Sequence, residues 1–409
     1  MIVLLMNKPR STTKRALWGG FLRGGFTLIE MLVVMFIVML LAAVALPTVR
    51  ETLQDQKNSR AARSLVSFID VARSRAIAEG REVGILVERL SDDVADTVGT
   101  SAAIRIRQLT GVPPYSGESS DAHALLSRVT AVLAGYNASG VSISIDWSTV
   151  PGVNQAAFTR TDNQLLAISS VLYNDADPAV RIKAPIRPYF DRIELPGGKL
   201  ATILQISHDA INVYVRFDLR EPTESPTTLM YPLGARRALT PNQAVKYRIH
   251  RSPIRSNTGP LSLPRGIVID FNYSGVGLTG GQFSNAFGIN NIVVIFGPDG
   301  RVSRYIDSAG TQHLPAGQLF FCLGDLAGVR PDDIYANTGR DRANIARDKS
   351  TWIVINNQTG RTFTAPMTSV SDATLALPTP NAAAIAAKFA QTLREARFLA
   401  SLSDKVEGI

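Results

Sequence analysis

The apolar positions near the N-terminus form one run that is almost free of polar residues. From Phe26 to Leu46 the chain has 21 residues, of which only Thr27 and Glu30 are polar. As an α-helix this run would be about 32 Å long, and the hydrocarbon core of a bilayer is about 30 Å thick. The pattern therefore predicts a transmembrane helix that carries a carboxylate near its start.

Beyond Pro47 the apolar positions recur with a helical period, and most arginines of this segment lie off the apolar stripe. The stripe consists of Leu65, Phe68, Ile69, Ala72 and Ala76. Pro47 removes one backbone hydrogen bond, which predicts a kink, and Gly80 is a natural helix end. We therefore expect one long kinked helix over 26–80.

After Gly80 the pattern changes to short alternating runs that are typical of strands. In 211–219 every second residue is apolar, which predicts a half-buried strand. Further strands or hairpins are predicted at 81–88, 263–271, 290–304 and 350–365, and helices at 121–135 and from Asn381 onward. The expected fold class is α+β. A long kinked N-terminal helix, transmembrane in its first half, packs on an antiparallel β-sheet head that has a large insertion and a C-terminal helix.

These elements divide the chain into four expected segments. They are a leader (1–25), a transmembrane and assembly helix (26–80), a β-rich head (81–366, with about 91–260 as an insertion) and a linker with an amphipathic helix (367–409). The apolar face of the last helix consists of Ile385, Phe389, Leu393, Ala396 and Leu399. We expect this face to dock on its own head; the alternative is a neighbouring subunit.

The formal net charge of +9 is concentrated at the N-terminus. Residues 1–25 contain five basic residues and no acid, so the remainder carries only +4. Basic residues before an apolar helix hold the N-terminus in the cytoplasm and direct the rest of the chain outward. The charge therefore says little about the partners of the mature protein.

The carboxylate of Glu30 needs a partner in these surroundings. A charged residue well inside a membrane helix costs roughly 2.5–3.5 kcal/mol on insertion scales. Cleavage between Gly25 and Phe26 would create an α-amine near Glu30, and the two charges would neutralise each other within one subunit or between neighbours. The alternatives are an uncleaved signal anchor and a secretory signal that is cleaved after Ala45.

Gly25, followed by "FTLIE" and an unbroken apolar helix, resembles the leader and processing site of type IV prepilins. The resemblance implies a prepilin peptidase that cuts after Gly25 and methylates the new N-terminal Phe26. It places Glu30 at the assembly position, and it extends to Pro47, where pilin helices commonly kink. It further implies a single-pass protein of the bacterial inner membrane with its head outside, which then joins other pilins or pseudopilins in a helical filament.

The segment "ARSRAIAEGREVGILVE", a helix end that leads directly into a strand, resembles the GspH/FimT branch of minor pilins and pseudopilins. With the later hairpins, this resemblance covers roughly 24–90 and 260–366. It implies a structural subunit of a type II secretion pseudopilus or of a type IV pilus-like filament. The alternative function is a pilus-associated adhesin or DNA-uptake receptor that uses the inserted head region.

No catalytic constellation is evident, so we expect no enzyme, cofactor or metal site. The four histidines are scattered, Cys322 lies in an apolar run typical of a buried thiol, and the Gly-rich stretch 275–280 lacks the following helix of a dinucleotide site. One candidate anion or DNA surface comprises Arg236, Arg237, Lys246 and Arg248. Relatives in DNA uptake are associated with a basic tail after the last hairpin. Here Thr362 follows Arg361, so nucleic acid is not the expected partner.

Overall fold

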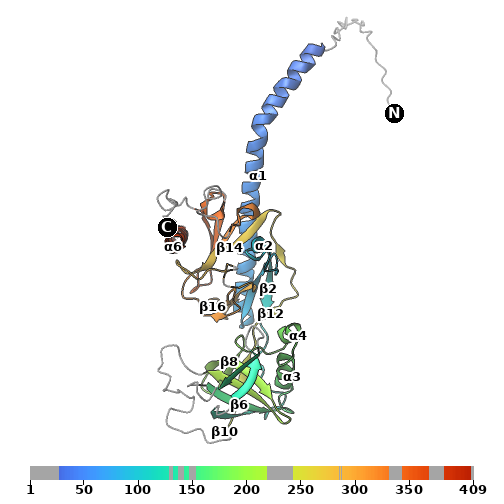
Figure 1. Ribbon diagram of the computed structural model, residues 1–409, viewed down its shortest axis with the longest axis vertical. Helices are drawn as coiled ribbons and strands as arrows, with labels where there is room; N and C mark the ends of the chain where they lie inside the picture. The colour runs from blue at the N-terminus through green and yellow to red at the C-terminus, as the bar shows by residue number, and fades with distance from the viewer. Residues whose placement is uncertain are drawn as a thin grey trace, which may run out of the picture. The chain divides into compact units, whose positions relative to one another are not determined.

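The computed structural model describes residues 27–128, 132–136, 142–146, 153–218, 243–284, 286, 288–330, 343–367 and 382–406 (Figure 1). The chain divides into two compact units, Met1–Gln54 and Asp55–Ile409, which are described separately. The described part contains helices and antiparallel sheets, so the predicted α+β class is confirmed. None of the helices in these ranges reaches the length and apolar content that crossing a membrane demands.

Helix α1 runs from Leu28 to Glu79 and shows that the two predicted helical patterns form one helix. Pro47 lies inside α1, and the kink predicted there stays a prediction. Gly80 ends the helix with a φ of +63°, a conformation that favours glycine. The predicted stripe is confirmed, because Leu65, Ile69, Ala72 and Ala76 are buried and Phe68 packs half-buried against the same cluster.

The second half of α1 packs on an eleven-stranded antiparallel sheet. The strand order is β17-β16-β15-β1-β2-β14-β18-β19-β20, with β12 and β13 also paired to β2. The bounds are β1 Val83–Arg89, β2 Ala102–Thr110, β12 Ile254–Arg255, β13 Leu261–Ser262, β14 Ile267–Val276, β15 Ile292–Phe296, β16 Val302–Ile306, β17 Gln312–His313, β18 Leu319–Asp325, β19 Thr351–Ile355 and β20 Thr362–Pro366. The strands predicted at 81–88 and 263–271 and both predicted hairpins are confirmed.

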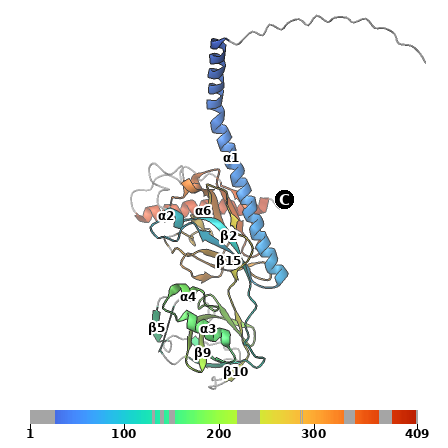
Figure 2. The same ribbon diagram turned by 90° about the vertical axis from the view of Figure 1, so that its right-hand side faces the viewer.

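Helix α6, Ala382–Val406, covers the opposite face of this sheet (Figure 2). Alternate residues of β18 show the two faces: Phe321 belongs to the core cluster under α1, whereas Phe320 belongs to the cluster under α6. Leu393, Ala396 and Ala400 of α6 are buried in that second cluster. The C-terminal helix therefore docks on its own head, as predicted, although the exposed Ile385 lies outside the contact.

Seven further strands form a closed ring between residues 124 and 250. The order is β10-β3-β6-β9-β8-β7-β11, and only Lys246 and Tyr247 separate β10 from β11, so the chain itself joins the two ends. The bounds are β3 Ala124–Arg128, β6 Val153–Thr159, β7 Arg192–Leu195, β8 Lys199–His208, β9 Asn212–Asp218, β10 Gln243–Val245 and β11 Arg248–His250. Apolar side chains fill the interior, which is typical of a small barrel.

Short elements complete the described part of the head. They are α2 Thr97–Thr100, α3 Gln164–Tyr173, α4 Pro178–Ile182, the hairpin β4 Val132–Tyr136 with β5 Ser142–Asp146, and the 3-10 turns η3 Leu326–Gly328 and η5 Asn344–Ala346. Leu166 of α3 is buried among the apolar side chains that fill the interior of the ring. Strand β2 lies in the interior of the eleven-stranded sheet, although its residues fall within the expected insertion.

The helix expected at 121–135 is wrong, because the chain forms β3 and β4 there. Ala124 and Leu126 are fully buried and Leu125 between them is partly exposed, which is the period-two pattern of a strand. Backbone pairing of β3 with both β6 and β10 outweighs the helix propensity of this alanine- and leucine-rich run.

Candidate functional site

The start of α1 is a capping box formed by Thr27 and Glu30. The backbone N–H of Glu30 donates to Thr27 Oγ1 at 3.2 Å, and Glu30 Oε2 accepts from the backbone N–H of Thr27 at 3.4 Å. The first turn is closed by the N–H of Met31, which donates to the carbonyl of Thr27 at 3.2 Å. In this arrangement the side chains at the N-cap and at the third helical position satisfy free N–H groups reciprocally.

The capping box gives Glu30 a partner within its own helix. Sequence reasoning missed it, although the signal was present in the Thr-x-x-Glu spacing of Thr27 and Glu30. A carboxylate in the first turn also interacts favourably with the helix dipole. Gly25 and Phe26, the residues of the predicted cleavage and methylation site, lie outside the described residues. The pairing of Glu30 with a new α-amine therefore stays a prediction.

The helix surface that follows is apolar on every side. All residues from Met31 to Leu41 are apolar and exposed, and the large side chains from Leu28 to Leu41 are between 47% and 84% exposed. A helix that is apolar all round is normally covered by lipid or by other protein. An exposed apolar surface of this extent is typical of a site that contacts other protein or lipid.

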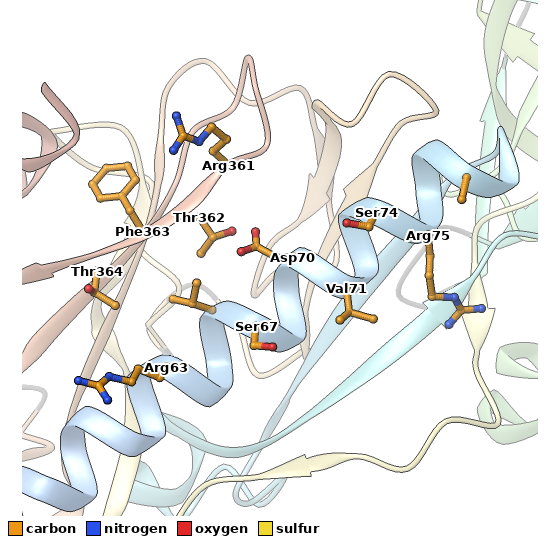
Figure 3. A pocket seen from close by; sticks show the side chains of 12 residues that line it. Arg63, Ser67, Asp70, Val71, Ser74, Arg75, Arg361, Thr362, Phe363 and Thr364 are labelled. Atoms are coloured by element: carbon orange, nitrogen blue, oxygen red, sulfur yellow. The ribbon is translucent and has the colours of Figure 1, made fainter. Parts of the chain in front are cut away.

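The head carries an open groove of about 760 Å³ between α1 and β20 (Figure 3). Its α1 side includes Arg63, Val66, Asp70 and Val71, and its β20 side runs from Arg361 to Thr364. The carboxylate of Asp70 is directed toward Thr362 (Figure 3). Burial raises the pKa of the Asp70 carboxyl, and Thr362, Arg73 and Arg361 partly oppose this increase. The groove lies in one unit of the structure, on the half of α1 that belongs to the head.

Arg73 attaches α1 to two hairpin turns beside this groove. Its Nε donates to the carbonyls of Gly300, at 3.2 Å, and of Thr359, at 3.0 Å. The two turns approach each other closely, so a Cβ at Gly360 would collide with the carbonyl oxygen of Gly300. The helix and both hairpins are therefore positioned by one arginine and one glycine.

The predicted anion surface is only partly described. Arg236 and Arg237 lie outside the described residues. The Nζ of Lys246 donates to the carbonyls of Ser120, at 2.6 Å, and of Ala122, at 3.4 Å, which engages this ammonium in the fold. Arg248 is exposed on β11. The described ranges include only Lys246 and Arg248 of the four residues, so the anion surface stays a prediction.

The structure also describes the Gly-rich stretch and the single cysteine. The Gly-rich stretch 275–280 accepts hydrogen bonds from Arg397 of α6 through the carbonyls of Gly277, at 2.8 Å, and Gly280, at 3.0 Å. Cys322 is fully buried, and burial raises the pKa of its thiol well above the usual value. Among the described residues, no three His, Cys, Asp or Glu side chains gather as a metal site would require.

Residues 22–46 match the family model described as the prokaryotic N-terminal methylation motif. This motif indicates a type IV pilin-like protein that is processed at its N-terminus. It implies processing by a prepilin peptidase, assembly with other pilins, and a protein that is first anchored in the membrane and then part of an extracellular filament. No curated protein and no solved structure matches the chain.

Proposed function

We propose that this protein is a minor pilin or pseudopilin of the GspH/FimT type, a structural subunit of a type II secretion pseudopilus or type IV pilus-like filament. The observation that carries the proposal is the methylation motif at 22–46, which includes the exposed apolar helix surface from Leu28 to Leu41. The proposed role is structural rather than catalytic. A processed, methylated N-terminus is of use only to a chain whose first helix leaves the lipid and packs beside its neighbours.

Before assembly, the run from Phe26 to Leu46 anchors the chain in the inner membrane. The five basic residues before it hold the leader in the cytoplasm, where the peptidase cuts after Gly25 and methylates Phe26. The head then lies in the periplasm. The head is large enough to make the contacts that are specific to this subunit, while α1 makes the contact that is common to all subunits.

Glu30 has two successive roles, one before processing and one in the filament. Its carboxylate closes the capping box with Thr27 before processing, so the membrane-inserted precursor never holds an isolated charge. After cleavage the α-amine of Phe26 provides a full positive charge nearby, on the same or on an adjacent subunit. Because one helix meets different patches on successive subunits, this contact is heterologous and builds a helical filament.

Glu30→Gln and Thr27→Ser test this proposal together. Gln keeps the shape and the ability to close a capping box but removes the charge, whereas Ser keeps the cap and the charge. We expect Glu30→Gln to be processed yet to be lost from the filament fraction, and Thr27→Ser to assemble like the parent. Normal assembly of Glu30→Gln would contradict the role of charge pairing. Failure of both variants to be processed would indicate an effect on the peptidase instead.

A further inference from the structure

We propose that the groove between α1 and β20 binds the acidic turn Ser91–Asp96 of a second copy of this chain. This inference rests on the proposed function, because it names a head-to-head contact within the filament. It commits to one occupant because both complementary surfaces are present on the same molecule.

The groove is lined by three arginines and one acid, and one of these arginines, Arg361, acts electrostatically on the acid Asp70. Arg63 and Arg361 are exposed, and neither forms an ion pair within the described ranges. The acid in the groove, Asp70, is directed at Thr362 and is held by burial closer to its neutral form than an ordinary aspartate. The groove therefore presents a net positive charge to any molecule that approaches it.

The strand side of the groove also offers backbone hydrogen bonds. β20 is the last strand in the order of its sheet. The N–H of Asn356 donates to the carbonyl of Arg361 at 2.9 Å, and the N–H of Met367 donates to the carbonyl of Ser350 at 3.2 Å. Because pairing alternates along an antiparallel ladder, Thr362 and Thr364 direct their backbone groups away from β19. The backbone N–H of Thr362 donates to Asp70 within the fold, so Thr364 is the residue that offers backbone groups to the groove.

The turn Ser91–Asp96 has the complementary charge and a preformed shape. The carboxylate of Asp93 accepts from the N–H of Ala95 at 2.9 Å, and that of Asp96 accepts from the N–H of Gly99 at 2.8 Å. These bonds shape the turn, and they leave Asp92 exposed with no hydrogen bond or ion pair in the described part of the chain. A preformed turn loses little conformational entropy when it binds.

The tip of the same turn is apolar. Val94 is 72% exposed, although it lies between acids. On the groove side, Val66 is half-buried and Val71 is 47% exposed, so both offer apolar contact. The turn thus presents one valine flanked by acids, and the groove presents two valines flanked by arginines, so the two surfaces are complementary in charge and in apolar contact. Because the groove and the turn are different surfaces, the contact is heterologous and can repeat along a filament.

Exposed ion pairs are individually weak and are screened by salt. The contact therefore gains its strength from tethering, because the apolar helices of adjacent subunits already hold the heads at high effective concentration. We expect the docked state in assembled subunits and not between dilute heads in high salt.

Site-directed crosslinking of the full chain tests the contact. Two differently tagged chains, one with Ser67→Cys in the groove and one with Ala95→Cys in the turn, are produced together in the membrane and treated with a bis-maleimide, so that Arg361 and Asp92 are kept. The native Cys322 is fully buried and so does not contribute. The control replaces Ala95→Cys by Asp121→Cys, an exposed position on another part of the head. We expect the Ser67/Ala95 pair to give at least five-fold more crosslinked dimer than the control.

A charge reversal separates the contact from a general effect on folding. Arg361→Glu and Asp92→Arg should each reduce the crosslink between Cys pairs placed at Val66 and Val94, and the two reversals together should restore it. Equal crosslinking of the test and control pairs, or a double reversal as poor as the single ones, would overturn the inference. If Phe26 is methylated and filaments form without the crosslink, only the docking contact fails. If no mature chain that begins with Phe26 is produced, the filament assignment itself fails.

Discussion

Asp270 predicts an unusual pH dependence of head stability. This aspartate of β14 is fully buried; its Oδ1 accepts from the N–H of Asn272 at 3.0 Å, and its Oδ2 accepts from Asn344 Nδ2 at 2.9 Å. It has no ion-pair partner among the described residues. Burial raises its pKa to about 7, and the asparagine contacts only partly oppose this increase.

The sign and size of the effect follow from linkage. The unfolded chain releases the Asp270 proton near pH 4, whereas the folded head keeps it until about pH 7. Between these values the folded state binds more protons, so the free energy of unfolding falls as pH rises. A difference of about three pKa units corresponds to about 4 kcal/mol, most of it lost between pH 4 and pH 7.

The assay is urea unfolding of the detergent-solubilised full chain at several pH values, for the parent and for Asp270→Asn. Trp352 is fully buried in the core cluster under α6, so its fluorescence reports on this region once Trp18 and Trp147 are replaced by Phe. A change in the free energy of unfolding that the amide causes equally at every pH does not affect the test. The prediction concerns the difference between the two variants in the slope of this free energy against pH.

Asp209→Asn is the matched control with the opposite sign. The hydroxyl of Tyr214 donates to Asp209 Oδ2 at 2.6 Å, and this bond, followed by the N–H groups of Asn212 and Ile211, lowers the pKa of this exposed carboxyl. Its contribution is present above the unfolded pKa and is lost as pH falls. If the profiles of the parent and Asp270→Asn run parallel from pH 4 to pH 7, the assignment of a protonated, buried Asp270 is wrong.

Three further predictions concern α6, the hairpin turns and the helix start. Leu393→Ala should lower head stability by about 2–5 kcal/mol and speed amide exchange throughout α6, because Leu393 is fully packed, whereas Ile385→Ala at an exposed position should not. Gly360→Ala should destabilise by about 1–3 kcal/mol in thermal unfolding, because φ is +66° and the Cβ would meet the Gly300 carbonyl, while Gly259→Ala has open space around it. Thr27→Ala should weaken the first turn of α1 by about 1 kcal/mol and raise exchange of the Met31 amide; unchanged exchange would argue against the capping box.

Local chemistry made much of the fold predictable. The period of the stripe from Leu65 to Ala76 defines the buried face of α1, and Pro298-Asp299-Gly300 defines a turn in which Gly300 has a φ of +77°. Long-range pairing was not predictable in the same way. The closure of the ring depends on β10 pairing with β3, more than one hundred residues earlier, and no local pattern encodes that partner.

At the candidate site, the residue types were readable and their partners were not. The Thr27–Glu30 spacing is a helix-start signal, whereas a carboxylate in an apolar run indicated an amine partner instead. The buried Arg397 is a stronger example: nothing in its sequence neighbourhood marks it as the residue that joins α6 to the carbonyl of Tyr273, at 2.7 Å, and to those of Gly277 and Gly280. A charge that is met by backbone carbonyls and by the ring of Phe320 is visible only in three dimensions.

The central claim is that this chain is cut and methylated as a prepilin and then joins a filament. Mass analysis of the N-terminal peptide of the mature protein, isolated from its own host, tests it most directly. The account predicts a chain that begins with N-methylated Phe26 and contains Glu30 unmodified. A mature chain that begins after Ala45, or one that keeps its leader, would contradict it.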